Sequence, residues 1–317
     1  MKNRMSTFLL PVLTVSFGAA AIMSPLAVYT ITLAFFGLPH VLSEFRYVDR
    51  RFMGKLRPNL LWRLGGLLSA SVVVRSMSVF HLLPSSIALP TELTLVICLA
   101  LSVAEQTAFQ RATAIGIALT IGLAVVLDPF TTAVGFSILH NLTPLGFLWQ
   151  ITPHPQRQKR MIWASLAFIG FPLLVATGLP HQMLTQFPVD PLAAGPLSRH
   201  LFVYVPPFLV GSDHSIDIFT ASVVAQGAHY FAVIVLLPGL LSKVEPEAKG
   251  VIPWPAARWF WMSVALLTTV GVMSFSQGFA ETRSLYGIIA SIHAWIEIPI
   301  LILALSGPIS LKTRVPM

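Results

Sequence analysis

Charge and cysteine are scarce in this sequence. Only 10% of its 317 residues are charged, against about 25% in an average soluble domain, so the chain has too little polar surface for a water-soluble globule of this size. Its 55% of hydrophobic residues also exclude a disordered chain. The single cysteine, Cys98, excludes a disulfide framework or a thiolate cluster within the chain. These absences leave a membrane protein with several spans.

The motifs of many soluble enzymes are missing as well. The sequence contains no Gly-x-Gly-x-x-Gly fingerprint, no P-loop, no His-Glu-x-x-His and no Gly-x-Ser-x-Gly. It also lacks the repeated His-x-x-His-His boxes of membrane desaturases and hydroxylases. Without a flavin or nicotinamide fingerprint, any reductant has to come from elsewhere or is not needed.

Long apolar runs dominate what is present. A window of about 20 mostly apolar residues, the length that crosses a bilayer, predicts an all-α transmembrane bundle. The bundle forms one integral membrane domain that covers residues 1–317, and the proline-rich stretch 181–214 is predicted to be an extracytoplasmic loop, re-entrant or interfacial. The ten predicted spans are 6–23, 25–45, 63–82, 91–110, 112–128, 130–150, 161–180, 215–240, 257–277 and 284–306.

Basic residues set the predicted orientation. They flank both ends of the chain and follow the second, fourth, sixth and eighth spans, as in 46–57 and 157–160. With ten spans these residues fall on one side, so both termini are predicted to be cytoplasmic. This distribution explains the net charge of +8 without a nucleic-acid partner. Residues 1–23 also resemble a signal peptide, although an uncleaved first helix fits the charge pattern better. The expected location is a bacterial cytoplasmic membrane.

Four histidines lie within the predicted spans, where an ionisable side chain is costly and marks a candidate functional residue. His40, His140, His229 and His293 belong to the second, sixth, eighth and tenth spans, which run in the same direction. At about 1.5 Å per residue along their helices, the four fall within a slab of about 8 Å. A single such histidine is equally well explained by a hydrogen bond to a neighbouring helix. Four at one depth predict imidazoles that converge on one point.

Carboxylates lie at a similar depth. His40 and Glu44, and likewise His293 and Glu297, share the spacing His-x-x-x-Glu, which places each glutamate on the helical face of its histidine. Glu105 lies in the fourth span, again in the half where the histidines are found. Each glutamate is therefore predicted to contact its own histidine or the same target.

These polar residues have further interpretations. Glu44 is also placed to be an interfacial residue that pairs with Arg46 or Arg50, whereas Glu297 has apolar neighbours on both sides and needs a buried partner. Arg75, within the third span, is expected to pair with an acid or to line a cavity.

The eighth span carries more polar residues. Gln226 lies three residues before His229, on the same helical face. At the outer end of this span, Ser212 or Asp213 is predicted to cap the helix N-terminus. A second metal site or the polar mouth of a cavity is the alternative for this group, which comprises Asp213, His214 and Asp217.

The ligand types indicate the metal. Imidazole is a good ligand for iron, copper and zinc, whereas carboxylates favour harder ions. Four histidines with a few glutamates and no thiolate cluster favour non-haem Fe(II). We expect one iron held by the four histidines, with glutamates as acceptors for the distal imidazole N–H groups. The alternative is a di-iron pair in which the glutamates are direct ligands.

The segment Gly37-Leu38-Pro39-His40-Val41-Leu42-Ser43-Glu44 resembles a signature of the membrane β-carotene 15,15′-dioxygenase family, the bacteriorhodopsin-related-protein-like enzymes. That signature is Gly-x-Pro-His-Gly-x-x-Asp, so this chain has Val41 in place of the glycine and Glu44 in place of the aspartate. His229-Tyr230-Phe231 is similar to a later helix of the family, but the histidine pattern downstream of it is not reproduced. The resemblance covers about thirty of the 317 residues.

This resemblance implies an iron site made of histidines, with His40 as a ligand, and oxidative cleavage of a carotenoid double bond. It implies a lipophilic substrate, O₂ as co-substrate and a surrounding of membrane lipid. Three other functions are open: a secondary transporter that uses intramembrane histidine and glutamate for proton or cation coupling, a di-iron lipid hydroxylase or desaturase-like enzyme, and a haem-binding cytochrome.

Overall fold

A computed structural model describes residues 14–104, 107–246 and 248–306. The described residues are helical or lie in loops, and no strand occurs among them. Within the described residues, seven helical segments are long and apolar enough to cross a membrane, which is typical of a multi-pass membrane protein. They are α2 (Pro25–Arg51) with η1 up to Lys55, α3 (Pro58–Val79), α5 (Ala108–Leu127), α8–η2–α9 (His154–Ala176), α11–η6–α12 (Ser215–Val244), α13 (Ala257–Gln277) and α14 (Phe279–Leu305).

Shorter elements complete the described part of the chain. The predicted first span is described only from residue 14, as the helix Thr14–Met23. Segment α4 (Ser85–Leu101) begins and ends earlier than the predicted span 91–110, and α8 begins at His154, earlier than the predicted span 161–180 and ahead of the basic residues in 157–160. The remaining elements are η1 (Met53–Lys55), α6 (Pro129–His140), α7 (Thr143–Ile151), α10 (Leu179–Met183), η3 (Leu197–Arg199), η4 (Leu201–Val203) and η5 (Pro207–Leu209).

The predicted span 130–150 is wrong as a single helix, because α6 ends at His140 and α7 begins at Thr143. Proline lacks the N–H that would continue a helix, and Pro144 therefore cannot donate to the carbonyl of His140, four residues earlier. The Thr143 hydroxyl lies 2.7 Å from that carbonyl and takes this role. The break places the C-terminal end of α6, which carries partial negative charge, at His140.

Two other spans contain a π-helical segment instead of a break. The segments η2 (Leu166–Gly170) and η6 (Ala232–Leu236) each end two residues before a proline, Pro172 and Pro238. A π-turn lengthens the helix by one residue locally, which accommodates the bond that the proline cannot form. In the predicted spans 161–180 and 215–240 the helix therefore continues through a π-helical segment and does not break.

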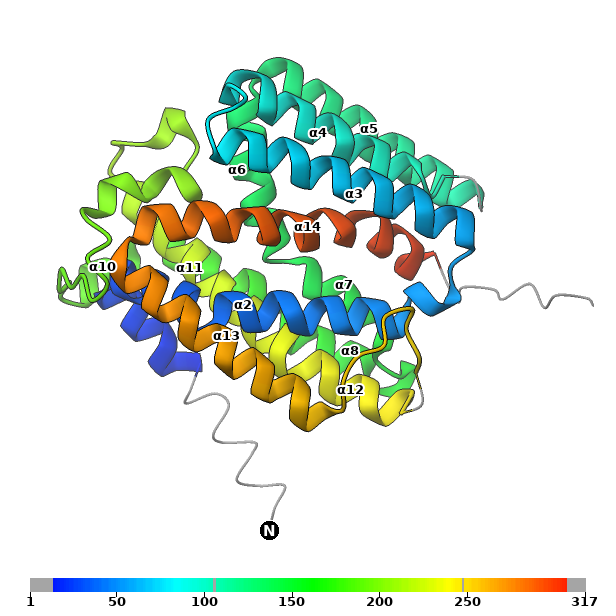
Figure 1. Ribbon diagram of the computed structural model, residues 1–317. Helices are drawn as coiled ribbons and strands as arrows, with labels where there is room; N and C mark the ends of the chain where they lie inside the picture. The colour runs from blue at the N-terminus through cyan, green and yellow to red at the C-terminus, as the bar shows by residue number, and fades with distance from the viewer. Residues whose placement is uncertain (1–13, 105–106, 247, 307–317) are drawn as a thin grey trace, which may run out of the picture.

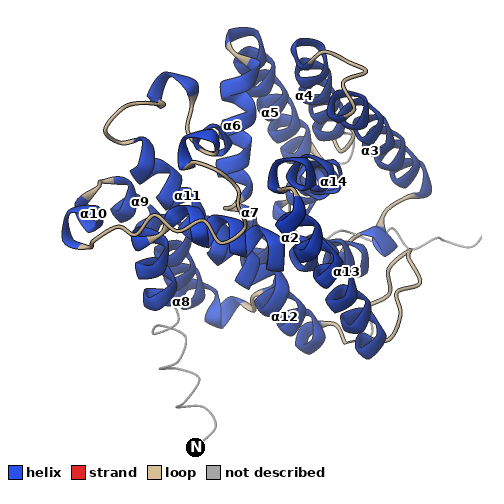
Figure 2. Ribbon diagram, turned by 60° about the vertical axis from the view of Figure 1, so that its left-hand side comes forward, coloured by secondary structure: helices blue, strands red, loops and turns tan. Residues whose placement is uncertain are grey.

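Helix α14 runs through the middle of the molecule, with α3, α4 and α5 on one side and α2 and α13 on the other (Figure 1). Figure 2 shows the same arrangement from a second direction. The most apolar windows of α2, α11–α12 and α14 are 61%, 50% and 56% buried, whereas those of α3, α5, α8–α9 and α13 are each 17% buried. Most of the buried ionisable residues lie on the three inner segments, and the outer helices expose leucine, valine and phenylalanine side chains such as Leu123 and Val126.

Several basic segments gather at one end of the bundle. Arg51 and Lys55 both pair with Glu245, and Arg51 Nε also donates to Gln150 at the end of α7, 3.2 Å away. Burial alone would raise the pKa of Glu245, but the two cations outweigh burial and lower that pKa overall. Through these contacts the basic end of the second predicted span meets the ends of α7 and α12.

At the same end, Asp49 anchors the connection between α12 and α13. Its buried carboxylate accepts hydrogen bonds from the backbone N–H groups of Val251 and Ile252 and from the indole Nε1 of Trp254, at 2.9, 3.2 and 2.9 Å. The loop approaches so closely that a Cβ at Gly250 would lie 1.7 Å from Asp49 Oδ2. Only glycine fits there without moving the anchor.

Asp49→Ala is expected to destabilise the protein, because three donors at the loop lose their acceptor. A hydrogen bond to a charged group contributes about 1.5–3 kcal/mol, so the loss of three should lower the midpoint of a thermal melt in detergent by about 5–10 °C. Asp213→Ala, which removes an exposed carboxylate, serves as the control and should melt like the wild type. Equal midpoints for both variants would show that the anchor contributes nothing to stability.

The segment between α10 and α11 packs onto the helices instead of extending away from them. Asp190 accepts from the N–H groups of Ala194 and Gly195, both at 2.8 Å. His200 is buried beside Tyr29, its Nε2 donates to Ala194 O at 3.1 Å, and its Nδ1 lies 3.0 Å from an Arg283 nitrogen. Burial lowers the pKa of His200, the bond to Ala194 partly offsets this, and Arg283 lowers the pKa again. The His200 ring is therefore neutral, and its Nδ1 accepts a hydrogen bond from Arg283.

Candidate metal centre

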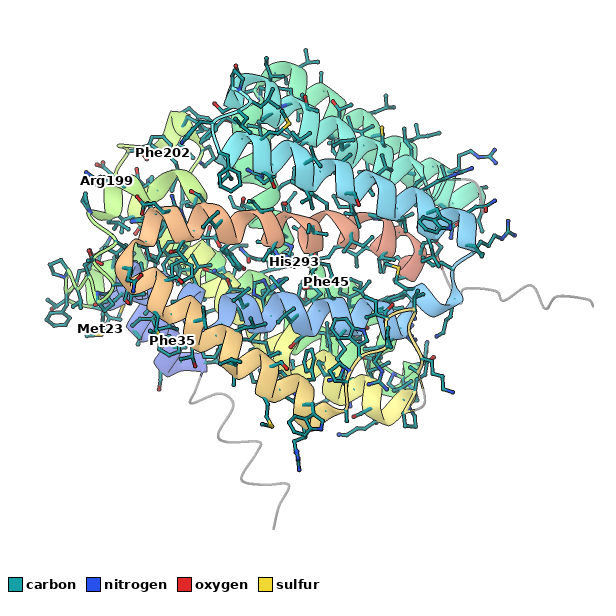
Figure 3. The ribbon with its side chains drawn as sticks, viewed as in Figure 1. Met23, Phe35, Phe45, Arg199, Phe202 and His293 are labelled. Carbon is teal, nitrogen blue, oxygen red and sulfur yellow. The ribbon has the colours of Figure 1, made fainter. Side chains whose placement is uncertain are left out.

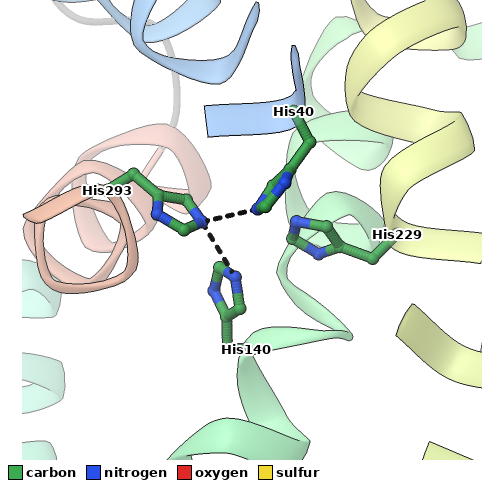
Figure 4. A group of neighbouring side chains, drawn as sticks. All are labelled: His40, His140, His229 and His293. Atoms are coloured by element: carbon green, nitrogen blue, oxygen red, sulfur yellow. Dashed lines mark hydrogen bonds between the residues drawn. The ribbon is translucent and has the colours of Figure 1, made fainter. Parts of the chain in front are cut away.

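The four intramembrane histidines meet in the interior of the bundle. His40 comes from α2, His140 from the end of α6, His229 from α11 and His293 from α14, and one nitrogen of each lies within 4.8 Å of the others. Figure 4 shows the four rings converging on a common space. Their centroids form a closed loop, with 4.8 Å between His40 and His293, 4.8 Å from there to His140, 4.5 Å on to His229 and 5.5 Å back to His40. The convergence predicted from their depth is present.

Hydrogen bonds fix which nitrogen of His40 faces this space. Its Nδ1 lies 3.1 Å from Phe36 O, and Nε2 lies 3.1 Å from His293 Nε2. Since a carbonyl only accepts, Nδ1 carries the proton and Nε2 presents its lone pair to the centre. Pro39 within α2 loosens this turn, and Tyr286 Oη donates to a second carbonyl of the turn, Gly37 O, at 3.3 Å.

His140 is held in the same sense by a carboxylate. Its Nδ1 lies 2.6 Å from Glu297 Oε2, and Thr143 Oγ1 lies 2.8 Å from Glu297 Oε1. His140 Nε2 therefore presents a lone pair to His293 Nε2, 3.1 Å away. Glu297 has the buried partner that its apolar neighbours required, but this partner is His140 across the bundle and not His293 on its own helix.

The remaining nitrogens leave the network incomplete. His293 Nε2 meets the lone pairs of both His40 and His140, yet it has at most one hydrogen to give. His293 Nδ1 and both ring nitrogens of His229 are buried and have no hydrogen-bond partner. Buried polar groups are normally paired. The Nε2 atoms of His40 and His293 are 3.1 Å apart. In a tetrahedral site with metal–nitrogen bonds of about 2.0–2.1 Å, two ligand nitrogens are about 3.4 Å apart, so the observed distance is close to that of a metal site.

Glu44 faces the same space. It is fully buried, neither of its oxygens has a hydrogen-bond partner, and Oε2 lies 3.6 Å from His229 Nε2. Together with His229 and Glu297 it forms a second group whose ligand atoms lie within 4.8 Å of one another. The interpretation of Glu44 as an interfacial partner of Arg46 or Arg50 is wrong.

Those two arginines bind the α12–α13 connection instead. Arg46 donates to Pro255 O and Arg50 donates to Ala248 O, at 3.3 and 3.0 Å. The third predicted glutamate, Glu105, lies outside the described residues.

The residues predicted around the eighth span have other roles. Gln226 Nε2 donates to Tyr230 Oη at 2.6 Å and belongs to neither group of potential metal ligands. The predicted cap is wrong: α11 begins at Ser215 after His214, without a side-chain cap, and Asp213 is exposed. The turn of the loop before α11 is instead held by the hydroxyls of Ser212 and Ser215, which both donate to Leu209 O.

Asp217 pairs with His181 on α10 and lies 3.5 Å from His214 Nδ1. Among the described residues, the groups of three or more potential ligands are the two at the centre, so Asp213, His214 and Asp217 do not form a second metal site.

Sequence reasoning missed the residues that pack the site. The Tyr230 ring stacks on His40 at 4.1 Å between centroids, with planes 27° apart. Phe45 packs edge-on against His293 between α2 and α14 (Figure 3), at 6.4 Å. Tyr230 lies four residues after Gln226, so the two side chains share one face of α11. That spacing could have identified Tyr230 as a neighbour of the site.

Comparisons with protein-family models, with curated proteins and with solved structures found no match to this chain.

Proposed function

We propose that this protein is a membrane-embedded non-haem iron oxygenase that acts on a lipophilic substrate. The observation that carries the proposal is the incomplete hydrogen bonding of four imidazoles whose ring nitrogens meet in one space, with the lone pairs of His40 and His140 directed into it. A divalent cation would accept these lone pairs, and the end of α6 at His140 favours positive charge there.

Charge balance favours one ion. Two carboxylates, Glu44 and Glu297, lie fully buried beside four uncharged imidazoles. A divalent ion and two ionised carboxylates sum to zero, which is the least costly total inside a bilayer. A second divalent ion among Glu44, His229 and Glu297 would leave excess positive charge unless an anion accompanied it. The di-iron hydroxylase or desaturase-like enzyme remains the alternative, and it would use this second group.

Ligand chemistry is compatible with iron. The donors are imidazole nitrogens with nearby carboxylates, a set that suits both iron and zinc, and the one cysteine, Cys98, lies exposed on α4 and belongs to neither group of potential ligands. The choice of iron rests on the resemblance around His40. Bound iron would supply O₂ activation. The chain contributes the ligands His40, His140, His229 and His293, the orienting acceptor Glu297 and an apolar surrounding that excludes water.

The reaction we propose is oxidative cleavage of a carotenoid double bond. One C=C bond and one O₂ give two carbonyl groups, so the balance needs no external reductant, in line with a sequence that has no flavin or nicotinamide fingerprint. The resemblance around His40 to the β-carotene 15,15′-dioxygenase family supports this choice. The proposed setting is a bacterial cytoplasmic membrane, with both termini on the cytoplasmic side.

The test is expression in a host that accumulates a carotenoid. The wild type should bleach the cells and yield aldehyde products that extraction and mass spectrometry detect, whereas a His229→Ala variant, expressed at the same level, should leave the colour unchanged. Bleaching by both proteins would place the chemistry elsewhere. Absence of both bleaching and aldehydes with iron-loaded wild type would rule out carotenoid cleavage.

One observation favours a second function, a secondary transporter. Transporters often bind substrate or ions where a membrane helix is broken, and the break between α6 and α7 lies at His140. This function predicts pH-dependent uptake into liposomes by protein that holds no tightly bound iron. Flux without bound iron would replace the oxygenase proposal.

A further inference from the structure

A cavity of about 640 Å³ lies between α3, α4 and α6, beside η4. This volume is within the range of about 300–1,000 Å³ of small-molecule sites. The apolar part of its lining includes Leu89, Pro90 and Val134, and two aromatic rings in it, Phe130 and Phe202, meet edge to face at 6.3 Å. The rest of the lining is polar.

Helix α6 connects this cavity to the histidine centre. Ala133 and Ser137 line the cavity, and His140 follows them at the spacing i, i+4, i+7, which keeps all three on one helical face. Ser137 lies about 4.5 Å before His140 along the helix axis. Among the four imidazoles, that of His140 is the accessible one: 18% of its side chain is exposed, against 0–2% of the residues His40, His229 and His293. A ligand in the cavity would therefore contact the helix that carries His140, about one helical turn from the most accessible of the four imidazoles.

The polar part of the lining contains an ion pair with a spare donor. Arg75 Nη2 lies 2.8 Å from Glu92 Oε2, and Glu92 is 1% exposed. The Arg75 Nε is buried and has no hydrogen-bond partner. A buried donor without an acceptor is costly, so the site lacks an oxygen at this position. The sequence-based expectation for Arg75, an acid partner or a cavity, is met on both counts.

The missing acceptor is neutral. Glu92 already balances the charge of Arg75, and Asp128 adds a second carboxylate to the lining. An anionic ligand would be disfavoured, because the two carboxylates in the lining outnumber its one guanidinium. A hydroxyl or keto oxygen can accept from Arg75 Nε without adding charge.

We infer that this cavity holds the end of the lipophilic substrate, and that it selects a substrate whose end carries a hydroxyl or keto group. The inference deepens the proposed function and rests on it for the reaction, but substrate binding can be measured without turnover. The polar pair recognises the oxygen, the apolar wall holds the adjoining hydrocarbon, and α6 directs the rest of the molecule to His140.

The test uses three fluorescent polyenes of one skeleton: all-trans-retinol with its hydroxyl, the corresponding hydrocarbon without it, and retinoic acid with a carboxylate. Affinities are measured on purified full-length protein in the same detergent micelles. The wild type should bind retinol about tenfold more tightly than the hydrocarbon, the effect of one hydrogen bond to a charged donor, and retinoic acid more weakly than retinol. Equal affinity for alcohol and hydrocarbon, or tighter binding of the acid, overturns the inference.

Two variants locate the site. Ser137→Phe fills the cavity and should weaken retinol binding at least tenfold, whereas Leu139→Phe, on an exposed position of the same helix, should bind as the wild type does. Arg75→Lys keeps the charge opposite Glu92 but lacks Nε–H, so it should fold normally and lose the preference for the alcohol. Unchanged preference in Arg75→Lys contradicts the inference even if Ser137→Phe fails to fold.

Metal analysis of the same samples separates the two proposals. Selective retinol binding by a protein that holds no iron would leave the cavity assignment standing and refute the oxygenase. Iron-dependent oxygenation with no selectivity among the three polyenes would support the oxygenase and refute the cavity assignment.

Discussion

Replacing His140 and His293 together by alanine is expected to remove the bound metal from the purified protein. Four-ligand structural metal sites reach apparent binding energies of about 10–16 kcal/mol, so two lost imidazoles correspond to a fall in affinity on the order of 10⁴-fold or more. The metal content should drop from near one ion per chain to the background of the measurement. The two residues come from different helices, α6 and α14, and meet at 3.1 Å between their Nε2 atoms.

The matched control is the double variant His81→Ala/His154→Ala. Both residues are exposed and belong to neither group of potential ligands, so this protein loses the same number of imidazoles but should keep its metal. Gel filtration and circular dichroism establish that each variant is folded before its metal is counted. Full metal content in folded His140→Ala/His293→Ala protein would refute the site.

Glu44→Gln is expected to weaken metal binding by about 10- to 100-fold, the usual effect of removing a carboxylate close to a metal, while the metal-free protein keeps its stability. No protein group donates to either oxygen of Glu44, so the neutral amide breaks no hydrogen bond in the fold. What it removes is a negative charge beside His229. The measurements are a competition titration with a chelator and a thermal melt of metal-free and metal-loaded protein.

A second buried carboxylate provides the contrast. Glu92 is as inaccessible as Glu44, but it is paired with Arg75. Glu92→Gln should lower the melting midpoint with and without metal, because the part-buried Arg75 loses the carboxylate that it pairs with, and should leave metal affinity unchanged. If Glu44→Gln instead destabilised the metal-free protein and left metal affinity intact, Glu44 would have a structural role and the charge-balance argument would fail.

The four histidines were predictable because the bilayer makes ionisable side chains informative. Depth along a helix follows from counting residues, so the shared level of His40, His140, His229 and His293 could be derived from the sequence alone. The partners of Glu44 and Glu297 could not. The spacing of four residues shows that a glutamate shares a face with its histidine, but which neighbouring helix that face meets depends on packing across the bundle.

The break after His140 was within reach of the sequence. Pro144 removes the hydrogen bond to the His140 carbonyl, which hydropathy does not register because the flanking residues are apolar. Asp49 was out of reach, since its partners Val251, Ile252 and Trp254 are about 200 positions away and contribute mainly backbone N–H groups. The pair of His181 with Asp217 escaped for a similar reason, because a short helix, α10, brings the imidazole over the start of α11.

The central claim is that the four buried imidazoles hold one iron ion, and elemental analysis of the full-length protein purified in detergent tests it most directly. The account predicts close to one iron per chain in protein from an iron-replete culture. Iron absent above the buffer background would contradict it, whether or not another metal takes its place, and so would two irons per chain.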